Sequence, residues 1–501
     1  MAGSLRLPVV KLEASLRADA LLVPVRTPQG RPKLPTLRGL STGAHARLKE
    51  LQAQYFGGKE AGAIDATVGG SGAPIKRLAL LSLGEDGTIS AGDVRMAAAK
   101  AFKWCEAHRC TRVAVAWDAL REAAGDEAAQ AFAEGLALAS FRYDERKAKK
   151  PNARHVEQAA FAVSRADGRL KTVLERGLRI AESVNLTRFL GHEPPNVINP
   201  VTLADCVRQI ARKAKLKFGV LDDRRIRELK MGALWAVGKG SASKPRLITL
   251  EYPGRQPNAK PIVLVGKAIT LDSGGYSLKP AASIPEMKYD KMGGMTVIGV
   301  LQACAALKVK ARVVGVIPSA ENLISGEAYR PGDILTAMNG KTIEVDNTDA
   351  EGRLILADAL HYAVETYRPA AMIDLATLTG AVVVALGTHA TGLFASDDAL
   401  AAALTASGER TGDRLWRMPL WKEYRKQIDS SEADLKNTGG REGGSCTAAV
   451  FLQEFVGTST PWAHLDIAGT AMIGKGTPLH PPGATGACVR LLIDYIEAQA
   501  R

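Results

Sequence analysis

The chain has 501 residues and a formal net charge of +14; 46% of its residues are hydrophobic and 24% are charged. This length exceeds one typical core, so we expect two domains, and the composition is that of an ordinary globular protein. The sequence shows no apolar run of about eighteen residues, no secretory signal pattern before Pro24 and no paired metal-ligand spacing among its six cysteines, so we expect a cytoplasmic protein with reduced thiols and no membrane span.

The first 165 residues alternate short apolar runs with Ala-rich stretches, which predicts a small α/β domain over 1–165. The expected strands are 20–25, 78–83 and 112–116, and the expected helices are 98–107 and 128–139. The first 150 residues hold 23 Lys and Arg against 16 Asp and Glu. A basic surface of this kind attracts nucleic acid or acidic partners, or is simply a solvated surface.

The charged amphipathic pattern of residues 166–190 predicts a helix that connects this domain to a second one over 191–501. The Pro194-Pro195 pair then interrupts the chain. Expected strands in the second domain are 261–266, 312–317, 342–346, 371–375 and 464–468, with helices at 296–308 and 353–366. This alternation predicts a mixed sheet covered by helices on both faces, with its chemistry in the loops past the strand ends.

One such loop carries the motif Asn347-Thr348-Asp349-Ala350-Glu351-Gly352-Arg353-Leu354. On an extended segment, carboxylates two residues apart point the same way. Two acids forced together repel strongly unless a cation lies between them, so Asp349 and Glu351 predict a metal site. The alternative is a helix N-terminus in which Asn347 or Thr348 is the cap and the acids favour the helix dipole.

Two upstream segments, 265–280 and 287–294, add Lys267, Asp272, Lys279 and Asp290. Four carboxylates suit two oxygen-preferring divalent ions better than one. A lysine binds a cation only when neutral, so spacing alone makes Lys267 a surface or ion-paired residue.

We expect Lys279 and Arg353 at the rim of the site, where positive charge stabilises an oxyanion on a peptide carbonyl. His464 lies in a strand-like run, which favours a packed core histidine.

The NTDAEGRL motif, the DSGG segment with its following lysine and the MKYD segment resemble the leucyl (cytosol) aminopeptidase family. The resemblance continues through 376–380, 433–441 and 462–469, and it covers nearly all of the chain from Asn185 onward; the first third resembles the family only loosely. Within the motifs, Lys291-Met292 replaces a more apolar pair after Asp290, which places an extra positive charge near the metal site.

The resemblance implies an α/β protein of two domains, each a mixed sheet flanked by helices, in which the larger C-terminal domain carries a dinuclear metal site. The implied ligands are Lys267, Asp272, Asp290, Asp349 and Glu351, binding manganese or zinc, with magnesium as a further alternative. Lys279 would polarise the scissile carbonyl, and Arg353 would hold a bicarbonate ion that acts as general base.

The implied activity is release of N-terminal leucine or another apolar residue from peptides by metal-activated water, with the substrate α-amine on one metal. The first side chain would enter a pocket lined by Met287, Thr377, Gly380 and Ala468, and Leu378 would offer backbone groups to the peptide. The family also implies a homohexamer, in which residues 1–165 serve assembly or regulation.

Two other hypotheses differ in class from the enzyme. Some bacterial aminopeptidases of this type bind DNA, and the basic first domain is compatible with that role. A catalytically inactive relative would have lost ligands, whereas all five implied ligands, Lys279 and Arg353 are present.

Overall fold

The computed structural model describes residues 6–7, 9–13, 15–27, 32–35, 37–54, 60–70, 72–85, 89–149, 156–165 and 168–499. The chain divides into two compact units, Met1–Asn185 with Lys475–Pro481, and Leu186–Gly474 with Pro482–Arg501. Helix α5 (Leu170–His192) carries the boundary. It corresponds to the helix predicted over 166–190, of which residues 166 and 167 lie outside the described residues.

The first unit is a mixed sheet flanked by helices, as predicted. Its elements are β1 (Val9–Lys11), β2 (Ala18–Val25), α1 (Thr42–Gln54), β3 (Ile64–Val68), β4 (Ile75–Ser82), α2 (Ala91–Ala107), β5 (Arg112–Ala116), α3 (Trp117–Ala124), α4 (Ala128–Ala139) and β6 (Gln158–Val163). The described strands run in the order β1-β6-β5-β2-β4-β3, parallel except for the antiparallel β3–β4 pair. Central β2, ADALLVPV, is buried along its whole length, as expected for a parallel strand covered on both faces.

Local sequence features define the start of helix α2 and its contact with helix α4. A capping box starts α2: the Asp93 amide donates to Ser90 Oγ at 3.2 Å, and the Ser90 amide donates to the Asp93 carboxylate at 2.9 Å. The two helices approach closely at Gly135, where a Cβ would lie 2.2 Å from the Arg95 carbonyl oxygen. A buried Arg95–Glu134 ion pair of 2.8 Å joins the same helices.

The second unit holds the remaining elements. They are α6 (Pro200–Ala214), β7 (Lys217–Leu221), α7 (Asp223–Glu228), α8 (Gly232–Gly238), β8 (Arg246–Tyr252), β9 (Ile262–Gly266), β10 (Ala268–Asp272), η2 (Ile284–Tyr289), α9 (Met292–Leu307), β11 (Val313–Asn322), β12 (Ile334–Thr336), β13 (Thr342–Glu344), α10 (Glu351–Tyr367), β14 (Ala371–Ala376), α11 (Gly380–Leu386), β15 (Thr391–Ala395), α12 (Asp398–Thr411), β16 (Leu415–Arg417), η3 (Lys422–Ile428), β17 (Leu435–Lys436), α13 (Gly444–Gln453), β18 (Trp462–Asp466), β19 (Met472–Ile473), β20 (Gly483–Ala484) and α14 (Val489–Ala498).

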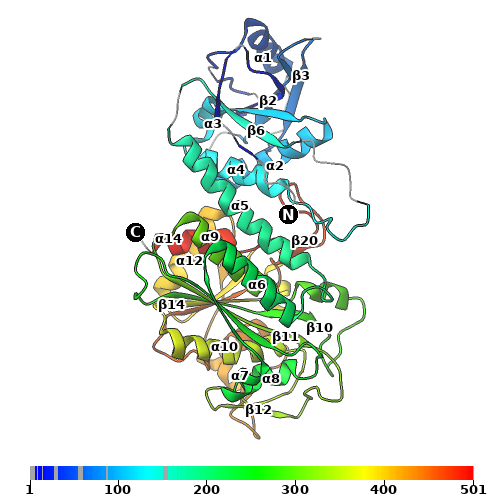
Figure 1. Ribbon diagram of the computed structural model, residues 1–501, viewed down its shortest axis with the longest axis vertical. Helices are drawn as coiled ribbons and strands as arrows, with labels where there is room; N and C mark the ends of the chain where they lie inside the picture. The colour runs from blue at the N-terminus through cyan, green and yellow to red at the C-terminus, as the bar shows by residue number, and fades with distance from the viewer. Residues whose placement is uncertain are drawn as a thin grey trace. The chain divides into compact units, whose positions relative to one another are not determined.

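The main sheet of this unit has nine strands among the described residues, in the order β16-β15-β18-β14-β9-β11-β8-β7, with β10 beside β11. The inner strands β18, β14, β9 and β11 are parallel and buried, and antiparallel strands extend the sheet on either side. Helix α9 packs on one face and α10 on the other (Figure 1). The predicted mixed sheet with helices on both faces is therefore confirmed.

Strand ends differ from the predictions where sequence periodicity is weak. We expected Asp272 in a loop, but it ends strand β10, which pairs with the end of β11 through a register irregularity between Ile269 and Asp272. A five-residue strand held on one side leaves little periodic signal in the sequence. Helices α9 and α10 begin earlier than predicted, at Met292 and Glu351.

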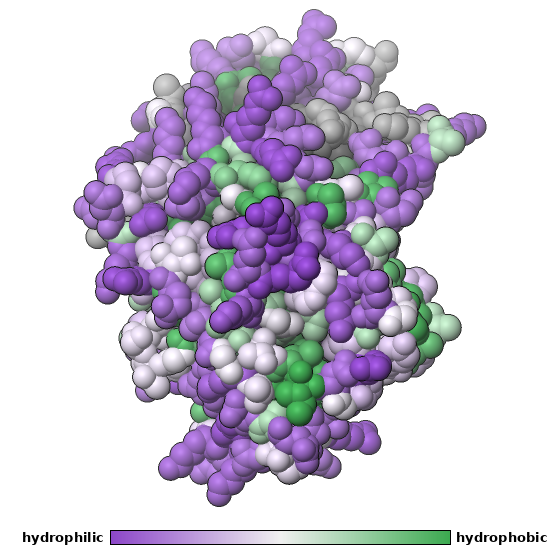
Figure 2. Space-filling view, turned by 60° about the horizontal axis from the view of Figure 1, so that its bottom comes forward, coloured by the Kyte–Doolittle hydropathy of each residue, from purple (hydrophilic) through white to green (hydrophobic). Residues whose placement is uncertain are grey.

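The face in Figure 2 is mostly hydrophilic, with small separate apolar patches. The large exposed apolar side chains of the second unit include Val384, Trp416, Trp421 and Leu278, which are 90%, 63%, 63% and 57% exposed. Among the described residues, no helix combines the length and apolar character needed to cross a membrane.

Asp358 anchors α8 to α10 from a fully buried position. Its carboxylate oxygens accept hydrogen bonds from the Leu234 amide at 2.8 Å and the Met338 amide at 2.7 Å. Asp358→Ala leaves buried donors unsatisfied, so we expect a loss of about 2–4 kcal/mol in the free energy of unfolding. Chemical denaturation measures this loss; exposed Asp126→Ala is the control, and equal midpoints for the two variants would contradict the assignment.

Candidate metal centre

Three buried carboxylates from separate elements meet beside the central strands. Asp272 ends β10, Asp290 follows η2 and Glu351 is the first residue of α10. Each offers an oxygen that lies within 4.8 Å of the others, and the residues are 2%, 6% and 1% exposed. Asp272 and Asp290 therefore meet Glu351, which lies 79 and 61 positions later in the sequence.

Two lysines lie among these acids. Lys267, between β9 and β10, has its Nζ 2.8 Å from Asp290 and 2.9 Å from Glu351, and donates to the Thr377 carbonyl at 2.8 Å. Burial alone would lower the pKa of Lys267, but the facing carboxylates of Asp290 and Glu351 raise it above its usual range. Lys267 is thus held as an ammonium ion unless another cation takes over its partners.

Burial also raises the pKa values of two of these acids. It raises the pKa of Glu351 to about 8, with Asp272 adding to the rise and Lys267 opposing it. It raises the pKa of Asp290 to about 6 against the opposing charge of Lys267. Desolvated carboxylates that repel one another favour the neutral form, and a bound cation would reverse this preference.

The donor set fits divalent cations. Asp290 Oδ2 is buried and has no hydrogen-bond partner among the described atoms, and Glu351 Oε1 accepts no hydrogen bond despite its ion pair with Lys267. Counting Asp349, four carboxylates face two ammonium groups, which leaves two formal negative charges. Buried oxygens without donors and an excess of negative charge are what a hard cation satisfies.

Asp349 lies outside the cluster of the three buried acids, and Lys279 links it to that cluster. Lys279 Nζ is 2.5 Å from Asp349 Oδ1 and 2.8 Å from Asp272 Oδ2. Burial would lower the pKa of Lys279, but Asp272, Glu351 and Asp349 together outweigh that effect and raise it above the usual range.

The segment that carries Asp349 is a turn, not the extended strand we expected. Asn347 Oδ1 accepts the Asp349 amide at 2.8 Å, which closes the turn. The N-cap alternative is wrong: α10 is capped by Ala350, without a side-chain hydrogen bond, because the Asn347 side chain is already engaged in the turn.

A missing side chain makes room for Lys267. A Cβ on Gly352 would lie 2.7 Å from both Cε and Nζ of Lys267. The first turn of α10 can therefore lie directly against the lysine only because residue 352 is glycine. The start of α9 also requires a glycine, because a Cβ on Gly293 would lie 2.1 Å from the Leu375 carbonyl oxygen.

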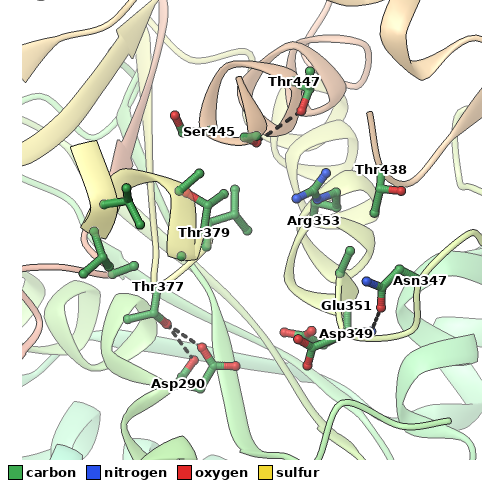
Figure 3. Close-up of a pocket in the computed structure, with 18 of the residues that line it drawn as sticks. Asp290, Asn347, Asp349, Glu351, Arg353, Thr377, Thr379, Thr438, Ser445 and Thr447 are labelled. Carbon is green, nitrogen blue, oxygen red and sulfur yellow. Dashed lines mark hydrogen bonds between the residues drawn. The ribbon is translucent and has the colours of Figure 1, made fainter. Parts of the chain in front are cut away.

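The acids lie in a cavity of about 900 Å³. In Figure 3, Thr377 and Asp290 lie on one side, and Asp349, Glu351 and Arg353 lie on the other. The five residues predicted to contact substrate all line this cavity: Met287, Thr377, Leu378, Gly380 and Ala468. Its remaining wall includes 438–441, which lie within the segment 433–441 that continues the resemblance, and the start of α13, which the motifs did not indicate.

Arg353 lies in the cavity wall, not at the rim as expected. It is 7% exposed, and its Nη1 donates to the Asn437 carbonyl at 2.7 Å. Its place in the first turn of α10, whose residues 351–360 are all buried, draws the guanidinium inward. Burial lowers the pKa of Arg353 to about 10.

Lys291 follows Asp290 in the sequence, and its side chain is fully buried. Its Nζ donates to the carbonyls of Gly191 and Glu193, both at 3.0 Å, and to that of Lys288. Burial, with Lys288 adding to the effect, lowers the pKa of Lys291 to about 7. The extra charge expected at this position is therefore engaged by backbone carbonyls.

His464 is a packed core residue, as predicted. It is fully buried, its Nδ1 lies 2.6 Å from Asp374 Oδ1, and its ring stacks on Phe394.

Two residues that support the site were missed. Asn322 ends β11 and donates to Asp272, while Asp466 ends β18 and accepts hydrogen bonds from the Leu378 amide and from Thr379 Oγ1. Each is a polar residue at the end of a buried strand, and Asp466 also lies within the segment 462–469 that continues the resemblance.

Comparisons with known proteins match both units. Residues 185–493 match the catalytic domain of the cytosol aminopeptidase family, and residues 22–150 match the N-terminal domain of that family. A probable cytosol aminopeptidase of Syntrophotalea carbinolica is 44% identical over 97% of this chain and 98% of its own length. One from Brucella suis is 44% identical over 88% of each chain.

A solved structure agrees with these sequence matches. The bottromycin maturation enzyme BotP, in complex with Mn, has 34% identity and a TM-score of 0.83, covering 97% of this chain and 100% of its own. Sequence identity over almost the whole length, a shared fold and a buried cluster of acids place this chain in the cytosol aminopeptidase family of metal-dependent aminopeptidases.

Proposed function

We propose that the chain is a dinuclear aminopeptidase that releases N-terminal leucine and other apolar residues from peptides in the cytoplasm. The observation that carries this proposal is the convergence of Asp272, Asp290 and Glu351, with Lys267 between them, at one wall of a cavity large enough for a peptide end.

Asp272, Asp290, Asp349, Glu351 and Lys267 would hold two divalent ions, manganese or zinc by preference and magnesium as the alternative. Such ions supply a Lewis acid for the carbonyl and lower the pKa of water towards neutrality. Lys267 would have to lose its proton to serve as a ligand, which its present carboxylate partners oppose. The manganese complex of the related bottromycin enzyme supports a divalent ion in this fold.

The chain's own groups would orient the peptide. Met287, Thr377, Gly380 and Ala468 line the cavity beside the acids, so they would hold the first side chain there, and their small or apolar character suits leucine. The Leu378 backbone would hold the peptide chain. Lys279, among the acids, would polarise the scissile carbonyl and stabilise the developing oxyanion.

Arg353 would hold bicarbonate as the general base. Its Nε is buried and has no hydrogen-bond partner among the described atoms, while Nη1 is fixed by Asn437. Arg353 lines the cavity, and a guanidinium with an unused donor suits a small planar anion.

Glu351→Gln tests the proposed metal centre. The substitution keeps the shape of the side chain and removes its charge, so we expect metal content to fall and kcat/KM for a leucine chromogenic amide to drop at least about a hundredfold. Chelator should abolish wild-type activity, and manganese or zinc should restore it. The control is Glu365→Gln, exposed on the same helix. Activity of Glu351→Gln within twofold of wild type would refute the metal role.

Gly380→Val tests the substrate pocket. A Cβ at Gly380 meets no atom within 4 Å, so the fold accepts a side chain that would occupy cavity space. We expect kcat/KM for leucine amide to fall about 10–100-fold relative to alanine amide. The exposed Gly326, whose Cβ also meets no atom within 4 Å, provides the matched Gly326→Val control. An unchanged preference in Gly380→Val would place the first side chain elsewhere.

A homohexamer is part of the proposal, with residues 1–165 serving assembly or regulation. The exposed Val384, Trp416 and Trp421 side chains support a subunit contact, since large exposed apolar groups mark interaction surfaces. Light scattering after size-exclusion chromatography should give the mass of six chains, and a monomeric mass at micromolar concentration would contradict this assembly. DNA binding stays a second hypothesis that rests on the basic first domain.

A further inference from the structure

Asn322 links the two halves of the candidate metal centre through one buried amide. Its Nδ2 donates to Asp272 Oδ1 at 2.8 Å and to the Thr348 carbonyl at 2.9 Å. The residue is fully buried, so neither bond competes with water. The orientation of the amide is decided by these partners, because the reversed amide would set its oxygen against two acceptors.

The first bond orients the Asp272 carboxylate. Oδ1 accepts from Asn322 and from the Gly274 amide at 2.9 Å, and Oδ2 is the oxygen that pairs with Lys279. The irregular register between β10 and β11 places Asp272 opposite Asn322. Asp272 is thereby held by one oxygen and presents the other to the cavity.

The second bond fixes the turn before α10. The Thr348 carbonyl also accepts the Tyr329 hydroxyl at 2.7 Å, and Thr348 Oγ1 donates to the Gly274 carbonyl at 2.6 Å. Thr348 directly precedes Asp349 in this turn, and Glu351 follows as the first residue of α10. The position of two further proposed ligands therefore depends on this carbonyl.

We propose that Asn322 is a positioning residue, which holds Asp272 and the Asp349–Glu351 turn at the separation that divalent metal binding requires. The inference deepens the proposed function and rests on it. Asn322 would act through the ligands and would touch neither metal nor substrate. Outer partners of metal ligands commonly set affinity in this way.

Manganese affinity of the full-length, metal-stripped protein tests the proposal, with chelator competition as the readout. We expect Asn322→Ala to weaken the apparent Kd for Mn²⁺ about 10–100-fold. Tyr329→Phe removes only the hydrogen bond from the Tyr329 hydroxyl to the Thr348 carbonyl, and it should weaken the apparent Kd for Mn²⁺ about two- to tenfold. Saturating Mn²⁺ should restore leucine-amide hydrolysis in both, because all ligands remain.

The matched control is Asn199→Ala, which removes two hydrogen bonds at the N-cap of α6. It should lower stability and leave the Kd for Mn²⁺ unchanged. The proposal is overturned if the Asn322→Ala and Tyr329→Phe proteins bind Mn²⁺ within twofold of wild type. If Asn322→Ala fails to fold, Asn322→Leu, which keeps the size of the side chain and removes its amide donor, decides in its place. Wild-type protein that binds no divalent metal would instead refute the proposed function, and this inference with it.

Discussion

Mutual repulsion among buried carboxylates is the constraint on which this catalytic unit is built. Asp272, Asp290 and Glu351 are all but inaccessible to water, and they lie close enough for Asp272 to disfavour ionisation of both Asp290 and Glu351. Such a group persists only if positive charge lies within it. Lys267 and Lys279 supply that charge in this structure. The chemistry proposed for the site follows from the same requirement.

The fold meets this constraint by bringing acids from separate segments to one end of the sheet. The parallel strands β9, β11, β14 and β18 are held in continuous register, and the acids lie in or just after the elements that follow them. The hydrogen bond from Asn322 to Asp272 and the hydrogen bonds from Leu378 and Thr379 to Asp466 then fix side chains and loops that the sheet alone would leave free. Strands thus set the coarse position of the acids, and buried polar contacts set the fine position.

The acids and the mixed sheet could be predicted from sequence because both leave local signals. Closely spaced acids after apolar runs indicate a site, and apolar runs of strand length indicate buried strands. Spacing alone could not give the partners of Lys267, since its contacts come from residues 23 and 84 positions away in the chain, and only the family resemblance grouped it with Asp290 and Glu351. The depth of Arg353 depends on the packing of α10, and the turn at Asp349 depends on one amide hydrogen bond. Asn322 resembles any polar residue that ends a strand.

Gly352 has no side chain, and this limits which residues could replace it. Lys267 occupies the space where any other residue would place its first side-chain carbon. A methyl group there would push the ammonium away from Asp290 and Glu351 and leave two desolvated acids facing each other. Position 352 is therefore constrained for a reason unrelated to its own chemistry, because any side chain there would displace a neighbour 85 residues earlier in the sequence.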